Sequence, residues 1–220
     1  MIHPPILLSS AYLPPISYVA RFFESENIIL DKYEFFSKQT IRNRCYIVAA
    51  NGILPLIIPV TGKSKQRTAM QEVCISNDIQ WQKIHWKSIE SAYRNSPFFE
   101  YYEDHFHEFY DRKYELLFDF NLQILIKIKK ILKLETPFTF SNTYHLVHPD
   151  LNLVDFRNHS DYDRKNISAV FTNFPYQQVF ANRHAFLPDL SIIDLLSNTG
   201  PHAKAYIENL NIAKQSFKTP

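Results

Sequence analysis

The chain has 220 residues, of which 45% are hydrophobic and 21% charged, and its formal net charge is +2. This balance is typical of a globular protein with a buried core and argues against intrinsic disorder. A charge so close to zero gives no electrostatic footprint for nucleic acid. One domain can accommodate this length and no internal repeat is visible, so residues 1–220 are expected to form a single domain.

Targeting and cysteine patterns predict a soluble, cytoplasmic protein. Prolines interrupt the segment from Met1 to Ala20, which also lacks the cationic start of a signal peptide. Asp119 and Lys127 interrupt the most apolar stretch, so no membrane insertion is expected. The two cysteines, Cys45 and Cys74, are too few for the disulfide framework of a small secreted domain, and they are expected to be free thiols.

The first elements are predicted to be a strand, a helix and a strand. Ile6–Leu8 is a short apolar run, and Pro15 suits the first turn of a helix from Ile16 to about Ser25. A second apolar run follows at Asn27–Leu30. This order is the unit that builds parallel sheets.

A β-hairpin is predicted next. Two apolar runs, Arg44–Ala50 and Ile53–Val60, are separated by Asn51-Gly52, a dipeptide that suits a two-residue turn. Two prolines in the second run lack N–H donors, which favours a strand at an edge. The polar segment Thr61–Met70 is predicted to be a mobile surface loop.

Helical periodicity begins at Ile79, with Asn77 or Asp78 as the N-cap and Pro97 as the stop. The first helix is expected to place Trp81, Ile84, Ser88, Ile89, Ala92 and Tyr93 on one face. Two further helices are predicted from about Phe98 to Asp111 and from about Asp119 to Leu134, and the three should pack as a helical layer or as an insertion.

The remainder of the chain is predicted to contain short strands, such as Pro137–Ser141, and one late helix. Ser191 and Asp194 have capping-box spacing at the start of that helix, and Gly200-Pro201 closes it. The predicted fold class is therefore α/β, with a small central sheet, a βαβ start, a β-hairpin and a three-helix segment that covers the sheet.

The scarcity of glycine excludes several nucleotide-binding and hydrolase motifs. The only glycines are Gly52, Gly62 and Gly200, so the Walker loop, the dinucleotide fingerprint and the nucleophile elbow are all missing. Phosphate could still be bound by side chains or by helix N-termini.

Arg42-Asn43-Arg44, just before a predicted strand, is the main polar cluster. Two guanidinium groups can grip a phosphate or a carboxylate, and in an extended segment Arg42 and Arg44 share one face while Asn43 points to the other. The alternative is a pair of surface arginines that bridge to acidic side chains.

His85 lies on the helix face that carries Trp81 and could act as a general acid or base, since its unperturbed pKa is near 6.5. The alternative is a half-buried histidine with a structural role. Other histidines, including His145, His148 and His159, lack any recognised metal-ligand spacing, so no metal site and no hydrolase triad is predicted, and no cofactor is identified.

Several segments, taken in order, resemble the WbqC-like family, in the version found in Bacteroidetes-type bacteria. They are Tyr12-Leu13-Pro14-Pro15-Ile16-Ser17-Tyr18, Arg42-Asn43-Arg44, Ile58-Pro59-Val60, Trp81-Gln82-Lys83-Ile84-His85 with the helix that follows, and Phe186 to Leu196 with Gly200-Pro201. Many members begin with His-Gln-Pro or Gln-Pro, whereas this chain has Ser9-Ser10-Ala11 there.

The resemblance implies work on cell-surface polysaccharide, because the family is named for a member encoded among O-antigen biosynthesis genes. The expected activity is a transferase that acts on an activated amino sugar or glycan precursor, with a sugar or acyl-type small molecule as substrate. The alternative is a non-catalytic scaffold of the same pathway. In the enzyme hypothesis Ser10 lines the site, Arg42 and Arg44 bind an anionic group, and Tyr12 and Trp81 stack on a ring. His85 moves the proton and Asn43 orients a hydroxyl.

Overall fold

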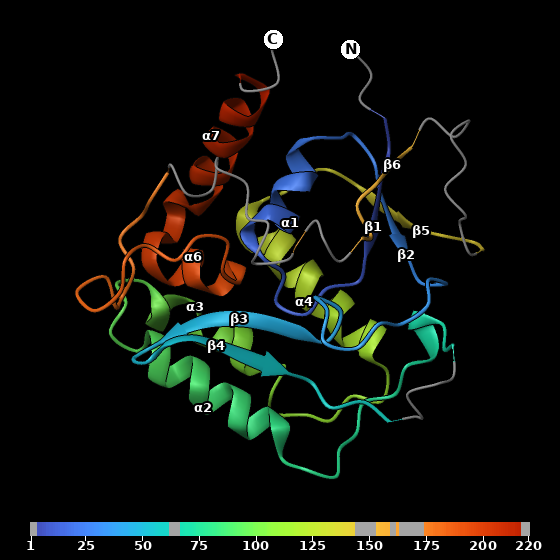
Figure 1. The fold of residues 1–220 in the computed structure, drawn as a ribbon, viewed down its shortest axis with the longest axis horizontal. Coiled ribbons are helices and arrows are strands. Elements are labelled where there is room, and N and C mark those ends of the chain that lie inside the picture. The colour runs from blue at the N-terminus through green and yellow to red at the C-terminus, as the bar shows by residue number, and fades with distance from the viewer. Residues whose placement is uncertain (1–3, 62–66, 144–152, 159–161, 163–173, 217–220) are drawn as a thin grey trace.

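The computed structural model describes residues 4–61, 67–143, 153–158, 162 and 174–216. Its centre is a parallel sheet with the strand order β5-β2-β1-β6, and a separate antiparallel pair forms the hairpin β3-β4 (Figure 1). The strands are β1 (Ile6–Ser9), β2 (Ile28–Asp31), β3 (Arg44–Ala49), β4 (Gly52–Ile57), β5 (Phe138–Phe140) and β6 (Val154–Asp155). The helices are α1 (Ile16–Ala20), α2 (Trp81–Tyr93), α3 (Phe99–His107), α4 (Leu117–Leu132), α6 (Ile192–Thr199) and α7 (Ala203–Ser216), with 3₁₀ turns η1 (Arg21–Phe23), η2 (Met70–Glu72) and η5 (Gly200–His202). The predicted α/β class is confirmed.

The βαβ start forms where the sequence predicts it. β1 and β2 pair in parallel, with Ile6 opposite Ile28 and Ser9 opposite Asp31, and α1 with η1 connects them. Side chains of both strands, of α1 and of α4 form one buried cluster, which includes Ile6, Leu8, Tyr18, Phe22, Ile28, Leu30 and Leu125. α1 and α4 therefore supply the apolar layer that covers the sheet.

The hairpin forms, but its turn lies one residue earlier than predicted. Ala49 pairs with Gly52, so Ala50 and Asn51 are the central residues. Gly52, with φ of +105°, is the first residue of β4. The single positive φ thus falls after the turn and not at both central positions, so the turn is not the type I′ turn that an Asn-Gly dipeptide favours.

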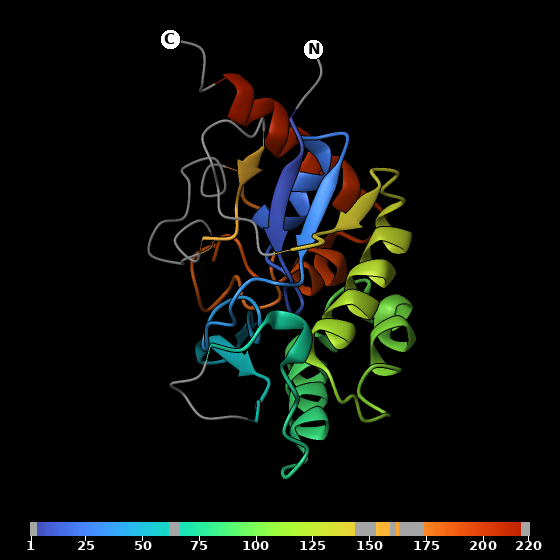
Figure 2. The ribbon, with the colours of Figure 1, turned by 90° about the vertical axis from the view of Figure 1, so that its right-hand side faces the viewer.

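The three predicted helices form, but they do not make one layer. α4 packs on the sheet, whereas α2 packs against β3 of the hairpin (Figures 1 and 2). Gln80, not Asn77 or Asp78, is the N-cap of α2. Of the residues expected on one face of α2, Trp81, Ile89, Ala92 and Tyr93 are buried, whereas Ile84 is 57% exposed.

The C-terminal part docks onto the first turn of the chain. Asp189 accepts hydrogen bonds from the backbone N–H of Ser17 (2.7 Å) and from its hydroxyl (2.8 Å), and Ser191 Oγ donates to Leu13 O. A carboxylate from the far end of the sequence thereby caps α1, which has no capping side chain of its own. Two of the segments that carry the family resemblance, the one from Tyr12 to Tyr18 and the one from Phe186 to Leu196, are therefore direct neighbours.

The helix at residue 192 begins as expected, with Ser191 Oγ accepting from Ile193 N. The capping box was wrong, because the buried carboxylate of Asp194 accepts from Tyr176 and Gln178 instead. α7, which the sequence analysis did not predict, packs against α1 and α6 (Figure 2).

Other expectations have mixed outcomes. Cys45 is buried, Cys74 is exposed, and both are free. Residues 62–66 of the predicted mobile loop lie outside the described residues, and its last residue, Met70, begins η2. Among the described residues, none of the helices has both the length and the apolar character needed to cross a bilayer.

Gly200 is required at the end of α6. Its φ is +55°, and a Cβ built there would lie 2.5 Å from the ring of Phe98. Gly52 shares the positive φ but has open space around it. Substitutions at the two glycines therefore separate the cost of backbone strain, which is present at both, from the cost of crowding, which is present only at Gly200.

We expect Gly200→Ala to lower the free energy of unfolding by about 2 to 4 kcal/mol, because left-handed strain adds to overpacking. Gly52→Ala should cost only about 1 to 2 kcal/mol, since strain alone acts there. Urea denaturation measures both. Equal losses in the two variants would contradict the crowding at Phe98.

Candidate functional site

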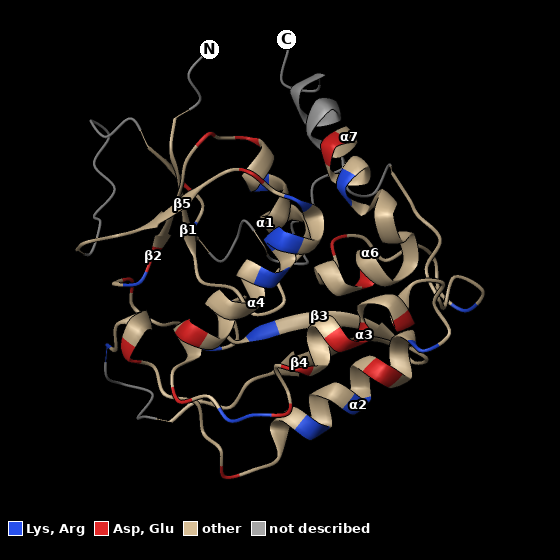
Figure 3. Cartoon of the chain, turned by 180° about the vertical axis from the view of Figure 1, so that it is seen from behind, with Lys and Arg blue, Asp and Glu red and all other residues tan. Residues whose placement is uncertain are grey.

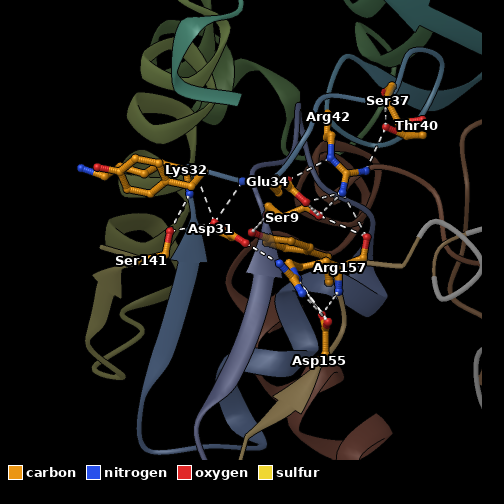
Figure 4. Close-up of polar contacts among 12 residues, drawn as sticks. Ser9, Asp31, Lys32, Glu34, Ser37, Thr40, Arg42, Ser141, Asp155 and Arg157 are labelled. Atoms are coloured by element: carbon orange, nitrogen blue, oxygen red, sulfur yellow. Dashed lines mark hydrogen bonds and ion pairs between the residues drawn. The ribbon is translucent and has the colours of Figure 1, made fainter. Parts of the chain in front are cut away.

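Polar and charged side chains collect where the parallel strands end. β1 ends at Ser9, β2 at Asp31 and β6 at Asp155, and Arg157 follows β6 (Figure 4). The chain leaves β1 toward β2 on one side, while β6 pairs on the other side, so β1 and β6 form the switch point of the sheet. Ligands of open α/β sheets bind outside the carboxyl ends of strands at such a point.

Asp31 joins three segments at this edge. Its buried carboxylate accepts from the backbone N–H groups of Tyr33 (2.9 Å) and Glu34 (3.1 Å) and from Ser141 Oγ (2.7 Å). It also forms an ion pair with Arg157. Ser141 directly follows β5, so this carboxylate holds the ends of β2, β5 and β6 together.

Arg42 lies in the same network and is 5% exposed. Its Nε donates to Glu34 Oε1 (2.9 Å), its Nη2 forms an ion pair with the second Glu34 oxygen, and Nη2 also donates to Ser9 Oγ (2.7 Å). Burial raises the pKa of Glu34, and the charge of Arg42 opposes that rise. The guanidinium is thus occupied by protein groups, and an anionic ligand would have to compete with Glu34.

Arg157 forms the outer part of the network. It pairs with Asp155 through Nε–Oδ1 (3.0 Å) and Nη2–Oδ2 (2.8 Å), and its carbonyl oxygen accepts from Arg42 Nη2 (3.1 Å). Three carboxylates and two guanidinium groups therefore meet at the edge: Asp31, Glu34 and Asp155 with Arg42 and Arg157. We call these five residues and Ser9 the carboxyl-edge network.

A hollow of about 430 Å³ lies beside this network, between η2, the start of α4 and the end of β5. It adjoins the network through the chain, because Lys32 follows Asp31 and Phe140 precedes Ser141. The hollow is lined by Lys32, Gln71, Glu72, Leu116, Phe118, Asp119, Leu122 and Phe140. Two carboxylates, an amide, an ammonium group and two aromatic rings thus face one space.

Tyr12, Trp81 and His85 meet in a second, aromatic cluster. Tyr12 Oη lies 2.9 Å from His85 Nδ1, and the edge-on rings of Trp81 and His85 have centroids 5.2 Å apart. Tyr110 Oη is 2.8 Å from Tyr12 Oη. All three predicted site residues are at most 5% exposed, so their rings contact one another and the core.

Burial lowers the pKa of His85 to about 4, and an interaction with the backbone of Ile57 only partly opposes this. Burial also raises the pKa of Tyr12 well above its usual value. At neutral pH the pair is therefore an uncharged imidazole beside an uncharged phenol. Such a pair can pass a proton only to a group that enters the core, so the catalytic role of His85 stays a prediction.

The expected common face for Arg42 and Arg44 does not form. Residue 42 lies in a turn, because the backbone N–H groups of Asn43 and Arg44 both donate to Thr40 O. Arg42 therefore points to Glu34, whereas the Arg44 guanidinium lies 5.2 Å from the ring of Tyr46. The assumption of an extended segment was wrong.

Asn43 and Ser10 have structural partners. Asn43 Nδ2 donates to Ile58 O (3.0 Å), and Asn43 Oδ1 accepts from Gln39 N (3.0 Å). Ser10 Oγ accepts from Asn121 Nδ2 (2.9 Å), which also donates to Arg42 O (2.8 Å). The structure thus brings Ser10 near Arg42, groups Tyr12 with Trp81 and His85, and leaves Asn43 and Arg44 outside both clusters.

Across residues 4–61, 67–143, 153–158, 162 and 174–216, no group of three or more His, Cys, Asp or Glu side chains could hold a metal ion. His145, His148 and His159 lie outside this range.

Removing one partner of the Arg42–Glu34 pair should leave the other buried charge without a counter-charge. We expect Arg42→Met to lower the free energy of unfolding by about 3 to 5 kcal/mol, and the double variant Arg42→Met/Glu34→Leu to recover more than half of that loss. Arg94→Met, which removes exposed ion pairs with Glu90 and Glu103, should leave the free energy of unfolding nearly unchanged. Chemical denaturation tests this, and a loss below about 1 kcal/mol for Arg42→Met would refute the buried pairing.

His85 should make the protein sensitive to mild acid. Its folded pKa, about 4, lies below the unfolded value near 6.5, so the unfolded state binds more protons between these pH values. Stability is then full above pH 6.5 and falls by roughly 3 kcal/mol toward pH 4. Between pH 6.5 and pH 4, the free energy of unfolding of the wild type should fall by roughly 3 kcal/mol more than that of His85→Gln. A difference that stays constant with pH would contradict the burial of a neutral imidazole.

The comparisons place these features in a family. The model of the WbqC-like protein family matches residues 9–156 and 152–206, a range that includes the carboxyl-edge network and the aromatic cluster. No curated protein and no solved structure matches the chain. Because the matched residues make up most of the sequence, the chain belongs to the WbqC-like protein family.

Proposed function

We propose that this protein is a transferase of cell-surface polysaccharide biosynthesis of the O-antigen type, and that it acts on an activated amino sugar or glycan precursor at the carboxyl edge of its sheet. The observation that supports this most is the hollow beside the carboxyl-edge network. The family resemblance supports the pathway in this proposal, and the geometry supports the position of the site.

The lining of the hollow suits a sugar. Hydroxyl groups of a sugar ring need donors and acceptors, which Gln71, Glu72 and Asp119 offer, and the apolar C–H face of the ring can pack on Phe140, which is 40% exposed. Lys32 can attract the phosphate of an activated precursor, and the carboxylates can attract a protonated amine.

The chemistry requires a group that removes a proton from the acceptor. Glu72 and Asp119 are exposed carboxylates in the hollow, so either can contact a substrate hydroxyl without opening the core. Within this proposal they are the first choice for the base, and His85 is the second. The carboxyl-edge network would position Lys32 and Phe140 through Asp31 and Ser141.

The alternative is a non-catalytic scaffold of the same pathway. One observation favours it: Ile53, Pro55 and Ile57 alternate along β4, and all three are exposed. An apolar stripe of this kind could dock a partner protein. In that case polysaccharide synthesis would depend on the exposed residues of β4 and not on the hollow.

Complementation of a deletion strain separates the two proposals. We expect Asp119→Asn/Glu72→Gln to reduce surface polysaccharide at least tenfold, because loss of general base catalysis typically costs about a hundredfold or more. The control Asp111→Asn removes an exposed carboxylate outside the hollow and should complement fully.

Two further variants complete the design. His85→Gln tests the proton-transfer role in the aromatic cluster, and Ile53→Ser/Ile57→Ser tests the exposed stripe of β4. Thermal melting of each purified variant shows whether it is folded. Full complementation by Asp119→Asn/Glu72→Gln, together with loss of polysaccharide in the stripe variant, would overturn the enzyme proposal.

A further inference from the structure

A second concave region lies far from the carboxyl edge, at the other end of the hairpin. This groove, of about 600 Å³, is bounded by α2, by the turn between β3 and β4, and by the segment Val179–Arg183. β3 starts beside Arg42 and ends at the groove with Ala49, so the length of a strand of about 20 Å separates the two regions. None of the residues that line the hollow lines the groove.

The outer wall of the groove is held in place by hydrogen bonds. His184 Nε2 lies 3.1 Å from Ala50 O, which ties the segment to the hairpin turn. Gln178 bonds to both N and O of Leu187 and to the buried carboxylate of Asp194 in α6. The wall therefore does not depend on a ligand for its shape, and the groove is preformed.

The charge of the groove has one sign. Among the residues that the structure describes, Lys87 on α2 and Arg183 on the opposite wall are the only ionisable side chains that line the groove, and no carboxylate lines it. Neither cation forms an ion pair with any residue that the structure describes. In Figure 3, by contrast, α2 and α4 each carry both basic and acidic residues, and α3 carries acidic residues without Lys or Arg. Two cations without carboxylates in one groove favour an anionic ligand.

Further donors lie along the same helix face. Ser91 is one turn beyond Lys87, and Asn95 is a further four residues on, so their side chains share one side of α2 and its C-terminal end. A hydroxyl and an amide thus lie beside the ammonium group. An oxyanion with several oxygen atoms can use all of them.

One part of the groove is apolar. Leu54, Ala92, Val179 and Phe180 line it, and the exposed side chain of Ile84 extends it. Its volume is within the range of small-molecule sites, about 300 to 1,000 Å³. A ligand that fills it would pair an anionic group with an apolar group.

We infer that this groove is a second binding site, and that its ligand is a small organic phosphate whose dianionic phosphoryl group lies between Lys87 and Arg183 while its carbon part packs on Val179 and Phe180. A phosphate monoester at pH 8 carries two negative charges, which match the two cations, whereas a carboxylate carries one. The inference does not depend on the proposed transferase activity.

Calorimetric titration with phenyl phosphate at pH 8 and low salt tests the site in the full-length protein. We expect saturable binding that weakens at least tenfold in Lys87→Met and in Arg183→Met. The matched control is Lys83→Met, which removes an exposed lysine of α2 that does not line the groove. Inorganic phosphate and benzoate, which lack the apolar group and the second charge respectively, should bind more weakly than phenyl phosphate.

Two outcomes would overturn the inference. One is no saturable binding of phenyl phosphate up to about 10 mM, an affinity too weak for a specific site. The other is unchanged binding in the double variant Lys87→Met/Arg183→Met with loss in Lys32→Met, which would move the phosphate to the hollow. Complementation by the double variant is measured separately, so failure of this site and failure of the proposed transferase activity remain distinguishable.

Discussion

The Arg42 guanidinium connects three segments that lie far apart in the sequence: the end of β1 at Ser9, the loop that carries Glu34, and the backbone after β6 at Arg157. A buried ion pair adds little net stability relative to an apolar replacement, but losing one partner is costly. The Arg42–Glu34 ion pair therefore favours one arrangement of these three segments over others, and it adds little to the overall stability of the fold. Here the selected arrangement is the closed carboxyl edge of the parallel sheet.

Because the side chains of the carboxyl-edge network are bonded to one another, they hold the edge together, and other residues are left to contact a ligand. Asp31 accepts four interactions, and Arg42 donates to three side chains and one carbonyl, so most of their hydrogen-bonding capacity is already used within the protein. Their effect is to place neighbours: Asp31 precedes Lys32, and its partner Ser141 follows Phe140. Asp31 and Arg42, which are hydrogen-bonded within the protein, thus support a hollow that is lined by other polar side chains. A preorganised site requires this kind of support.

Local patterns were sufficient for much of the fold. The apolar runs at Ile6 and Asn27, the proline before Ile16 and the glycine after Asn51 indicate the βαβ unit and the hairpin, because each acts on its own few residues. The pattern was insufficient for β6, which is only two residues long and pairs with β1 across almost the whole sequence. Pairing of this kind leaves no periodic signal.

The site was harder to predict for a related reason. Glu34, Asp31 and Arg157 look like surface residues, since charged side chains are rarely buried unless they are paired, and the partners are not visible locally. A weak signal existed: Asp31 directly follows the apolar run that forms β2, at the end where ligands bind. The arginine pattern and the family resemblance suggested a ligand-binding role for Arg42, which stays a prediction, and neither indicated its buried partner Glu34.

α2 shows why nearness in sequence misleads about nearness in function. His85 and Lys87 are two residues apart, so a helix directs their side chains to different sides. His85 faces the aromatic cluster, where burial keeps it uncharged, and Lys87 faces the open groove. Neighbouring residues of α2 therefore lie in two different environments, a buried uncharged cluster and an open groove with positive charge. Any mechanism that uses both residues on one ligand would have to unwind the helix that holds them, so the buried and the exposed face of α2 must be assigned separate roles.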